Sequence, residues 1–322
     1  MRITRILFLG LFAVMLGGFV AGPVAAQVCQ WTQVSSSGPS PRYIHSMAFD
    51  STRGKTVLFG GYSGTFLGDT WEWDGATWTQ VASTGPAPRF GAALAFDSDR
   101  SKTVLFGGFS GTYYGDTWEW DGGSWTQVAS AGPSPRQVPG MVFDSDRSRM
   151  VLFGGFSGLT YGDTWEFDGS TATWTQVAST GPGRRLTRNG ISYDSVRIKT
   201  VLFGGWNGDD GSYYGDTWEW DGAGWTQVAS GGPSPREGHG TAYHVDNQVT
   251  MLFGGSHGPS YNDTWAFEGT TATWTQVAST GPPPRSYTSM VYDSTRGVLV
   301  LFGGSSGPLF GDTWEYACSC SK

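Results

Sequence analysis

The chain has 322 residues, with 20 Lys and Arg against 27 Asp and Glu and a mean hydropathy of −0.26. This acidic balance, a formal net charge of −7, disfavours nucleic acid and anionic membrane surfaces as partners. Cysteine is scarce (3 residues), which excludes both a small disulfide scaffold and a metal site built from a cysteine cluster.

The N-terminus is predicted to be a signal peptide, residues 1–26. Two arginines precede an uncharged apolar run over residues 6–20, and Val24 and Ala26 are placed for cleavage before Gln27. Glycines and a proline weaken this run as a membrane span, so an uncleaved anchor is the alternative. The expected location is secreted or periplasmic, without stable membrane insertion after cleavage. The mature chain would keep 18 basic and 27 acidic residues, a net charge of −9.

A repeat fills the rest of the chain, and it is marked by six glycine pairs that each follow an apolar run. The pairs lie 47, 47, 50, 50 and 49 residues apart, at Gly60–Gly61, Gly107–Gly108, Gly154–Gly155, Gly204–Gly205, Gly254–Gly255 and Gly303–Gly304. The extra residues of the longer intervals fall in turns. A period of this length with several short strands per copy is typical of a β-propeller.

Each repeat contains four predicted strands, which we call a to d. In the first copy they are residues 45–50, 56–61, 69–74 and 78–83, separated by polar or glycine-containing turns. Strand b is continuously apolar, as expected for a strand that is buried on both faces. Helical periodicity is essentially absent from the mature chain. The prediction is an all-β, six-bladed propeller with four-stranded antiparallel blades over residues 27–322, expected to be a monomer.

Tryptophans recur at fixed positions and support this register. Strand c carries Trp71, Trp118, Trp165, Trp218, Trp265 and Trp314, and strand d carries Trp78, Trp125, Trp174, Trp225 and Trp274, with Trp31 as the sixth. Large aromatic side chains at one position per blade are expected to fill the wedge between neighbouring sheets.

A glycine pair after an apolar strand, followed by a spaced Asp and Trp, resembles the kelch repeat and the central propeller of galactose oxidase. The usual tyrosine of that repeat is replaced in most copies, which carry Trp73, Trp120, Phe167, Trp220, Phe267 and Tyr316. A sialidase-type propeller is the rival, but its Asp-box motif is incomplete here. The resemblance implies that ligands bind on the face formed by the d-to-a and b-to-c connections, here called the loop face.

Residues that repeat in every blade are expected to serve the blade, whereas varying positions are free to serve a ligand. One arginine precedes strand a in each copy, namely Arg42, Arg89, Arg136, Arg185, Arg236 and Arg285. The favoured interpretation is that each guanidinium ties its loop to neighbouring carbonyls. The alternative is a ring of arginines that recognises an anionic ligand.

The varying positions give the remaining site candidates. Three residues after the arginine come His45, Ala92, Pro139, Arg188 or Asn189, His239 and Thr288. After the glycine pair come Tyr62, Phe109, Phe156, Trp206, Ser256 and Ser305. Trp206 opens the longest of these loops, residues 206–215, which also contains Tyr214. Aromatic rings beside Asn, Asp and Arg suit a carbohydrate; the alternative is that these rings pack the loops together.

Catalytic templates mostly fail. His257 lies near His239 in the predicted fold, but two histidines without a located carboxylate are a weak metal signal, so no metal or other cofactor is predicted. The copper oxidase chemistry of galactose oxidase needs a Cys–Tyr cross-link, and the cysteines here lie at the chain ends. The leading hypothesis is an exported module that binds a glycan or a protein. The alternatives are a sugar-modifying enzyme, similar to kelch-type sialic acid epimerases, and a purely structural surface protein.

The last repeat stops after strand c, and the first residues of the mature chain supply the missing strand d. The segment CQWTQV, residues 29–34, matches it, so the N-terminal strand is expected to complete the last blade and close the ring. By repeat alignment Cys29 falls in the same turn as Cys318 and Cys320. A disulfide from Cys29 to one of these two cysteines is therefore predicted.

Overall fold

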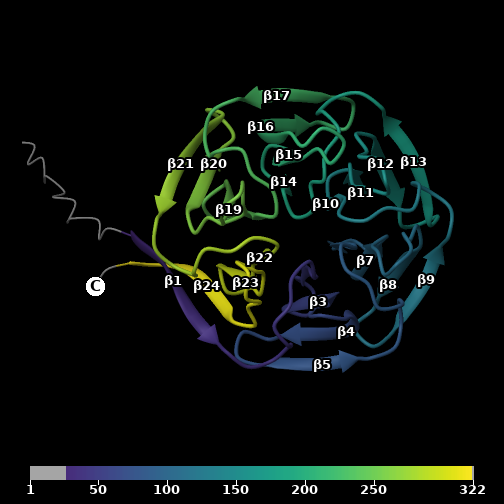
Figure 1. Cartoon of the computed structure of the whole chain (residues 1–322), viewed down its shortest axis with the longest axis horizontal. Helices are drawn as coiled ribbons and strands as arrows, with labels where there is room; N and C mark the ends of the chain where they lie inside the picture. The colour runs from purple at the N-terminus through teal and green to yellow at the C-terminus, as the bar shows by residue number, and fades with distance from the viewer. Residues whose placement is uncertain (1–26, 321–322) are drawn as a thin grey trace, which may run out of the picture.

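The computed structural model describes residues 27–320 and consists of six four-stranded antiparallel sheets arranged in a ring (Figure 1). This confirms the predicted six-bladed propeller. The predicted signal peptide, residues 1–26, lies outside the described residues. Over residues 27–320 there is no helix with the length and apolar character needed to cross a membrane.

The first three blades follow one another in chain order. Blade one consists of β2 (Ser46–Asp50), β3 (Lys55–Tyr62), β4 (Phe66–Trp73) and β5 (Trp78–Ala82). Blade two consists of β6 (Ala93–Asp97), β7 (Lys102–Phe106), β8 (Thr117–Trp120) and β9 (Trp125–Ala129). Blade three consists of β10 (Gly140–Asp144), β11 (Arg149–Phe153), β12 (Thr164–Asp168) and β13 (Thr173–Ala178).

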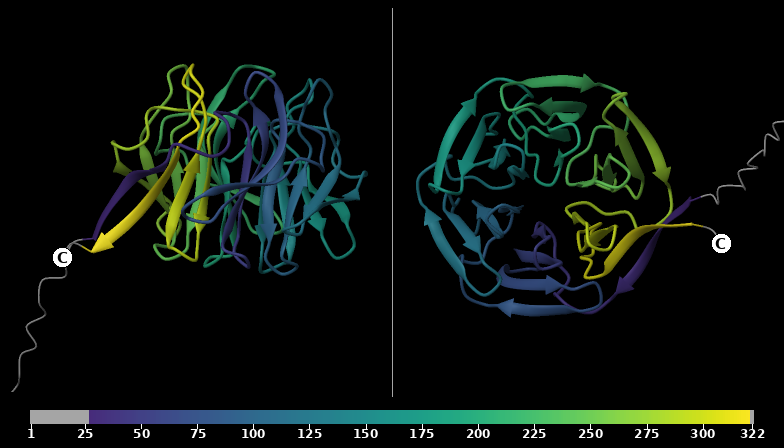
Figure 2. Two further views of the ribbon diagram at one scale, coloured as in Figure 1. Left: turned by 90° about the horizontal axis from the view of Figure 1, so that it is seen from below. Right: turned by 180° about the vertical axis from the view of Figure 1, so that it is seen from behind.

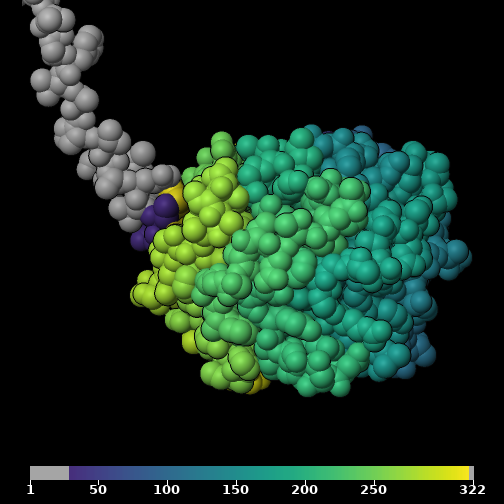
Figure 3. Space-filling model, turned by 90° about the horizontal axis from the view of Figure 1, so that it is seen from above, coloured from purple at the N-terminus to yellow at the C-terminus, as the bar shows by residue number. Residues whose placement is uncertain are grey.

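The other three blades complete the circle, and Figure 3 shows blades of the second half of the chain side by side along the outer wall. Blade four consists of β14 (Ile191–Asp194), β15 (Lys199–Trp206), β16 (Tyr213–Trp220) and β17 (Trp225–Ala229). Blade five consists of β18 (Gly240–His244), β19 (Val249–Phe253), β20 (Thr264–Glu268) and β21 (Thr273–Ala278). Blade six consists of β22 (Ser289–Asp293), β23 (Val298–Phe302), β24 (Thr313–Cys320) and β1 (Gln27–Ser35).

The predicted strands of the first repeat match β2 to β5 closely, with one difference. In blades one and four, strand b runs on through the glycine pair, so that β3 ends at Tyr62 and β15 at Trp206. The residues after these pairs form a hairpin, in which Tyr62 pairs with Phe66 and Trp206 with Tyr213. Part of the predicted loop is therefore strand in these two blades.

The core lies between the blades, where strand-d tryptophans pack against the preceding blade. Trp78, for example, lies 5.3 Å from the ring of Phe302 in β23. Its indole N–H also donates to the hydroxyl of Thr313 at 2.8 Å. The same bond recurs at all six junctions, in the pairs Trp31–Thr264, Trp78–Thr313, Trp125–Thr70, Trp174–Thr117, Trp225–Thr164 and Trp274–Thr217. Each space between two blades is thus filled by an apolar tryptophan ring, and the indole N–H keeps a hydrogen-bond acceptor.

The glycine pairs are required by backbone contact with the next blade. Gly60 has φ of 64°, and a Cβ there would lie 2.6 Å from the carbonyl oxygen of Arg89. The next residue, Gly61, donates its N–H to this same oxygen at 3.0 Å. Any side chain at Gly60 would both strain the backbone and break this contact.

The ring closes as the sequence predicts. Strand β1 pairs antiparallel with β24, and Figure 2 shows these two strands side by side. Trp31 of β1 occupies the same position as the other strand-d tryptophans and donates to Thr264. Cys29 lies opposite Cys318 and forms a disulfide with it, across a sequence separation of 289 residues. The partner left open by the sequence is therefore Cys318.

We expect Cys29→Ser to lower the thermal unfolding midpoint under oxidising conditions. The bond closes a loop of nearly the whole described chain, and loop entropy sets an upper limit of about 5 kcal/mol on its contribution. Differential scanning calorimetry of a chain that begins at Gln27 measures this change. Cys320→Ser is the matched control, which should leave the midpoint unchanged; an unchanged midpoint in Cys29→Ser would show that strand pairing alone closes the ring.

Candidate functional site

The six repeated arginines are buried and paired within their own blades. Arg136, fully buried, donates from Nη1 and Nη2 to the two carboxylate oxygens of Asp163, and from Nη1 to the carbonyl of Gly154 at 3.0 Å. Its guanidinium lies 3.8 Å from the ring centre of Tyr161. The carboxylate contacts recur in the pairs Arg42–Asp69, Arg89–Asp116, Arg185–Asp216, Arg236–Asp263 and Arg285–Asp312. These contacts support the interpretation that the arginines serve the blade.

Tyr214, a candidate from the sequence, belongs to the same arrangement. Its ring covers the guanidinium of Arg185 at 3.8 Å, as Tyr114, Tyr161 and Tyr261 cover theirs. The structure therefore places Tyr214 among the contacts that hold a blade together.

The ion pairs should make the fold sensitive to acid. Burial by itself would raise the pKa of Asp163, but the hydrogen bonds and charge of Arg136, with the indole of Trp165, hold it below its usual value. Asp69, Asp216, Asp263 and Asp312 are shifted in the same direction for the same reasons. A lowered folded-state pKa stabilises the fold above the unfolded pKa, near 4, and this contribution is lost as the pH falls through the folded value.

Asp163→Asn should lower the free energy of unfolding by about 3 to 5 kcal/mol at pH 7, because it leaves Arg136 buried without its counter-ion. Urea denaturation measures this loss, and the variant should also depend less on pH below about 4. Asp99→Asn, at an exposed turn of blade two, is the control and should change stability by less than about 0.5 kcal/mol. Equal stability of the two variants would contradict the assignment.

Six linker residues meet around the axis of the ring on the loop face, all with a left-handed backbone. They are Ile44, Gly91, Val138, Arg188, Gly238 and Tyr287, with φ between 48° and 65°. At five of the six junctions the N–H of one donates to the carbonyl of the preceding one: Gly91 to Ile44, Val138 to Gly91, Arg188 to Val138, Tyr287 to Gly238 and Ile44 to Tyr287. A circle of backbone hydrogen bonds therefore surrounds the axis.

The circle is open between Arg188 and Gly238, where the described residues form no such bond. The linker of blade four is one residue longer than the others, and its extra length carries Asn189 across the channel. Asn189 Nδ2 donates to the carbonyl of Thr288 at 3.1 Å and to Ser289 Oγ at 2.8 Å, and the Asn189 carbonyl accepts from the N–H of Thr241. Asn189 is thus a plug in the channel, and Arg188 stands beside the gap.

An axial pocket of about 220 Å³ opens at this gap. Its walls include Arg188 and Trp206, which the sequence proposed, and Glu237, Tyr287 and Gln137, which it did not. Arg188 lies over the ring of Tyr287 at 4.7 Å, and Tyr287 donates its hydroxyl to Glu237 at 2.9 Å. Two buried polar atoms, Arg188 Nη1 and Gln137 Oε1, have no hydrogen-bond partner within residues 27–320.

The charge of Arg188 is exceptional among the arginines of the linkers. Burial lowers its pKa to about 10, so the guanidinium stays protonated at neutral pH. Burial also raises the pKa of Glu237, in spite of the hydroxyl of Tyr287 and the nearby positive charge of Arg188. Over residues 27–320, no carboxylate forms an ion pair with Arg188. The pocket therefore holds a positive charge that lacks a direct counter-ion.

A second hollow on the loop face, of about 690 Å³, lies next to the axial pocket and shares Glu237 and Tyr287 with its lining. It extends over blades five and six, and its lining is rich in serine: Ser256, Ser260, Ser286, Ser305 and Ser306. Short side chains follow the glycine pairs in these two blades, so the loops leave space between them. We call these two neighbouring hollows together the groove.

Blades one to three present aromatic side chains in place of this groove, and these rings pack on one another. Phe66 stacks on Phe90 at 5.7 Å, and Phe109 contacts Phe90 at 5.7 Å and Tyr113 at 4.8 Å. Tyr62 lies edge-on to Phe66. The candidates Tyr62 and Phe109 therefore belong to a packed aromatic wall, while His257 stacks on Tyr213 at 4.2 Å.

His45 and His239 lie beneath the loop face and line neither hollow of it. Both are buried, with their rings edge-on to Phe302 and Phe203. Burial, with the charge of Arg236, lowers the pKa of His239 to about 3, and burial with the charges of Arg42 and Arg188 lowers that of His45. No group of three or more potential metal ligands gathers anywhere in residues 27–320.

Sequence reasoning missed Gln137, Glu237 and Tyr287, although it searched the right segment. It compared the third residue after each arginine, whereas Gln137 and Glu237 come first and Tyr287 second. Each first residue pairs with the residue after a glycine pair, as Leu186 does with Trp206 and Glu237 with Ser256. Variation at these earlier positions is the signal that could have found them.

A closed ring of six antiparallel sheets with a polar pocket on its axis defines a six-bladed β-propeller with a candidate binding face. The family model described as the KLHDC2/KLHL20/DRC7 Kelch-repeats domain matches residues 24–189 and, in an overlapping match, residues 122–304. These matches span most of the chain, which therefore belongs to the Kelch-repeat family. No match was found among the curated proteins.

Proposed function

We propose that the chain is an exported binding module whose loop face recognises a segment of another protein. Kelch propellers generally serve as protein-interaction modules. The observation that carries the proposal is the buried Arg188 guanidinium, whose Nη1 has no partner in a pocket that opens on the loop face. An unpaired buried charge is costly, and its retention is explained where a ligand supplies the missing partner.

The backbone of the circle to which Arg188 belongs points to the same face of the propeller. A left-handed conformation at a residue other than glycine costs on the order of 1 kcal/mol or more, and such strain gathers at functional sites. Arg188 has φ of 48°, while Gly91 and Gly238 occupy the equivalent positions of blades two and five. Ile44, Val138 and Tyr287 share this strain in the other three blades, so the whole circle around the axis is strained and Arg188 is its one charged member.

The shape of the groove favours a peptide segment over a sugar. An extended segment could lie over the serines of blades five and six and place one acceptor group against Arg188, where serine hydroxyls and exposed main chain offer hydrogen bonds along its length. A sugar would need free ring faces, whereas the half-buried rings of Phe66, Phe90 and Phe109 pack against one another. Trp206 beside Arg188 is the observation that keeps a glycan as the second candidate ligand.

Catalysis receives less support than binding. The epimerase alternative uses an arginine and a histidine at this face, and His239 is buried below it with a pKa near 3. A histidine that is neutral and enclosed at neutral pH is a poor general acid. The proposed function is therefore binding without turnover.

Selection of peptides from a displayed library, alongside a glycan array, tests the proposal with the purified mature chain. Arg188→Ala should weaken binding of a selected peptide by about tenfold or more, since buried arginines are frequent hot spots. Alanine keeps the same backbone restriction, so this variant tests the side chain alone. Isothermal titration calorimetry measures the affinity.

Arg184→Ala is the matched control, because Arg184 lies in the same linker with its side chain 63% exposed. It should bind the peptide as the wild type does. Equal affinity of Arg188→Ala and the wild type would remove the proposed site. Glycan binding that is lost in Trp206→Ala, with no peptide selected, would favour the second ligand class.

A further inference from the structure

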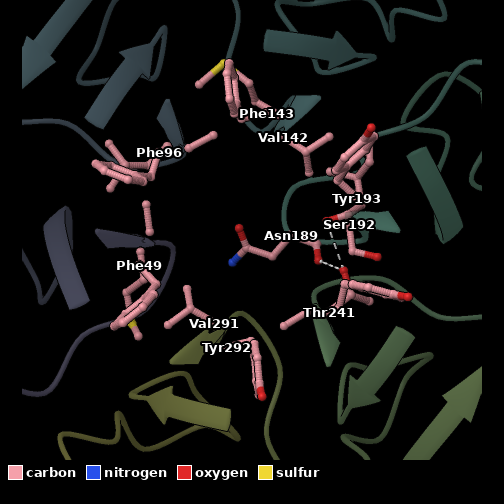
Figure 4. Close-up of a pocket in the computed structure, with 18 of the residues that line it drawn as sticks. Phe49, Phe96, Val142, Phe143, Asn189, Ser192, Tyr193, Thr241, Val291 and Tyr292 are labelled. Carbon is pink, nitrogen blue, oxygen red and sulfur yellow. Dashed lines mark hydrogen bonds between the residues drawn. The ribbon is translucent and has the colours of Figure 1, made fainter. Parts of the chain in front are cut away.

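A separate cavity of about 410 Å³ occupies the channel on the face opposite the loop face. It is formed by the innermost strands of all six blades, and Figure 4 looks along it. Asn189 and Arg188 stand at its inner end, and serines of the a-to-b turns, Ser51, Ser98, Ser145, Ser195 and Ser294, line its mouth. The plug formed by Asn189 thus divides the channel into two pockets with different linings.

Six aromatic residues surround this cavity, one from each blade at the position before the last residue of strand a. They are Phe49, Phe96 and Phe143 in blades one to three, and Tyr193, Tyr243 and Tyr292 in blades four to six. Figure 4 labels all of them except Tyr243. Tyr193 and Tyr292 donate their hydroxyls to Asp146 at 2.7 Å and to Asp246 at 2.6 Å. Each of these carboxylates belongs to the preceding blade, so both hydroxyls already have partners.

Small side chains leave the space inside this ring. The residue before each aromatic is Ala48, Ala95, Val142, Ser192, Ala242 or Val291. Figure 4 shows Val142 and Val291 projecting into the hollow from different sides. Val142 is half-buried and lines the cavity, so a larger residue at this position would take up part of the space.

The inner end of the cavity offers one hydrogen-bond acceptor. The carbonyl of Thr288 can only accept, so the Asn189 amide must turn its nitrogen toward Thr288 and its oxygen away from it. No described residue donates a hydrogen bond to this oxygen, and Figure 4 shows the amide of Asn189 inside the circle of aromatic residues. Apart from Arg188, the lining contains no charged residue.

We propose that this cavity is a second binding site, for a small neutral molecule with an aromatic body and one hydrogen-bond donor, such as an indole or a phenol. The circle of six aromatic side chains, with the alanine and valine side chains, buries the aromatic body of the ligand. The oxygen of Asn189 accepts the donor. A cationic ligand is disfavoured, because no carboxylate lines the wall and the one charged residue of the lining is the positively charged Arg188. This site lies on the other face of the propeller and goes beyond the proposed protein binding.

Indole titrated into the purified mature chain tests the site by isothermal titration calorimetry. We expect saturable binding of one indole per chain. 1-Methylindole lacks the donor and should bind about fivefold more weakly, the value of one hydrogen bond of about 1 kcal/mol. Changing the ligand in this way leaves the protein untouched.

Val142→Phe should weaken indole binding at least tenfold, because the larger side chain fills the hollow. Val277→Phe is the matched control: the same substitution on β21 at the outer rim, where Val277 is 41% exposed, should leave binding unchanged. If Val142→Phe does not fold, Val291→Phe fills the same space from blade six. Absence of indole binding to the wild type, or equal binding by the filled variants, would overturn the proposal.

The two proposed sites can be refuted independently of each other. Val142→Phe should keep the affinity for a peptide selected on the loop face, and Arg184→Ala should keep both affinities. Loss of indole binding with unchanged peptide binding in Val142→Phe supports the second site. If the protein bound 1-methylindole as tightly as indole, the role of Asn189 would be contradicted.

Discussion

The propeller depends on the ion pair between the buried arginine that enters each blade and the aspartate that precedes the repeated Thr-Trp of that blade's third strand. The linker that crosses from one blade to the next forms only an isolated bridge to a loop, and the guanidinium adds hydrogen bonds to the carboxylate and to the carbonyl of the glycine pair. The paired glycines exist because this linker approaches strand b so closely. Once the position of the arginine is set, the positions of the two residues that follow it are set as well. The first of these residues pairs with the loop after a glycine pair, and the second belongs to the circle around the axis. The scaffold therefore decides where a ligand-binding residue can stand.

A second ion-pair system ties the opposite face together, and its one interruption coincides with the closure of the ring. Arg53 bonds Asp50 and Glu72 of its own blade and lies against Gly122 in the c-to-d turn of the next blade. The same set recurs around Arg100, Arg147, Arg197 and Arg296. In blade five all three members are replaced, by His244, Asn247 and Ala266. The next blade has the two chain ends in place of that turn, and Cys29, Cys318 and Ala266 pack there against an apolar cluster. At the junction between blades five and six, a disulfide and apolar contacts therefore replace the ion pairs that are found at the other five junctions.

One extra residue in blade four places Arg188 and Asn189 between the two pockets of the channel. Were this linker as short as the others, the backbone circle would close at Gly238 as it does at the other junctions. The insertion opens the circle, leaves Arg188 without a counter-ion and sends Asn189 across the channel to Thr288. A repeated scaffold thus acquires a particular site by a local departure from the repeat, which costs little because the neighbouring blades keep the ring closed.

The sequence by itself determined the six blades, their strands, the closure by the first strand and the presence of a terminal disulfide, because each rests on a pattern repeated along the chain. It also singled out Arg188, Asn189 and Trp206, since each departs from that pattern. Only the tertiary structure decided that Cys318 is the bonded cysteine, that Tyr62 and Phe109 pack in an aromatic wall, and that His239 is enclosed. It alone brought Glu237, Tyr287 and Gln137 to Arg188. The physical reason is that local patterns fix the blade, whereas a pocket on the axis is made of single residues from several blades, and no spacing within one repeat shows which of them meet.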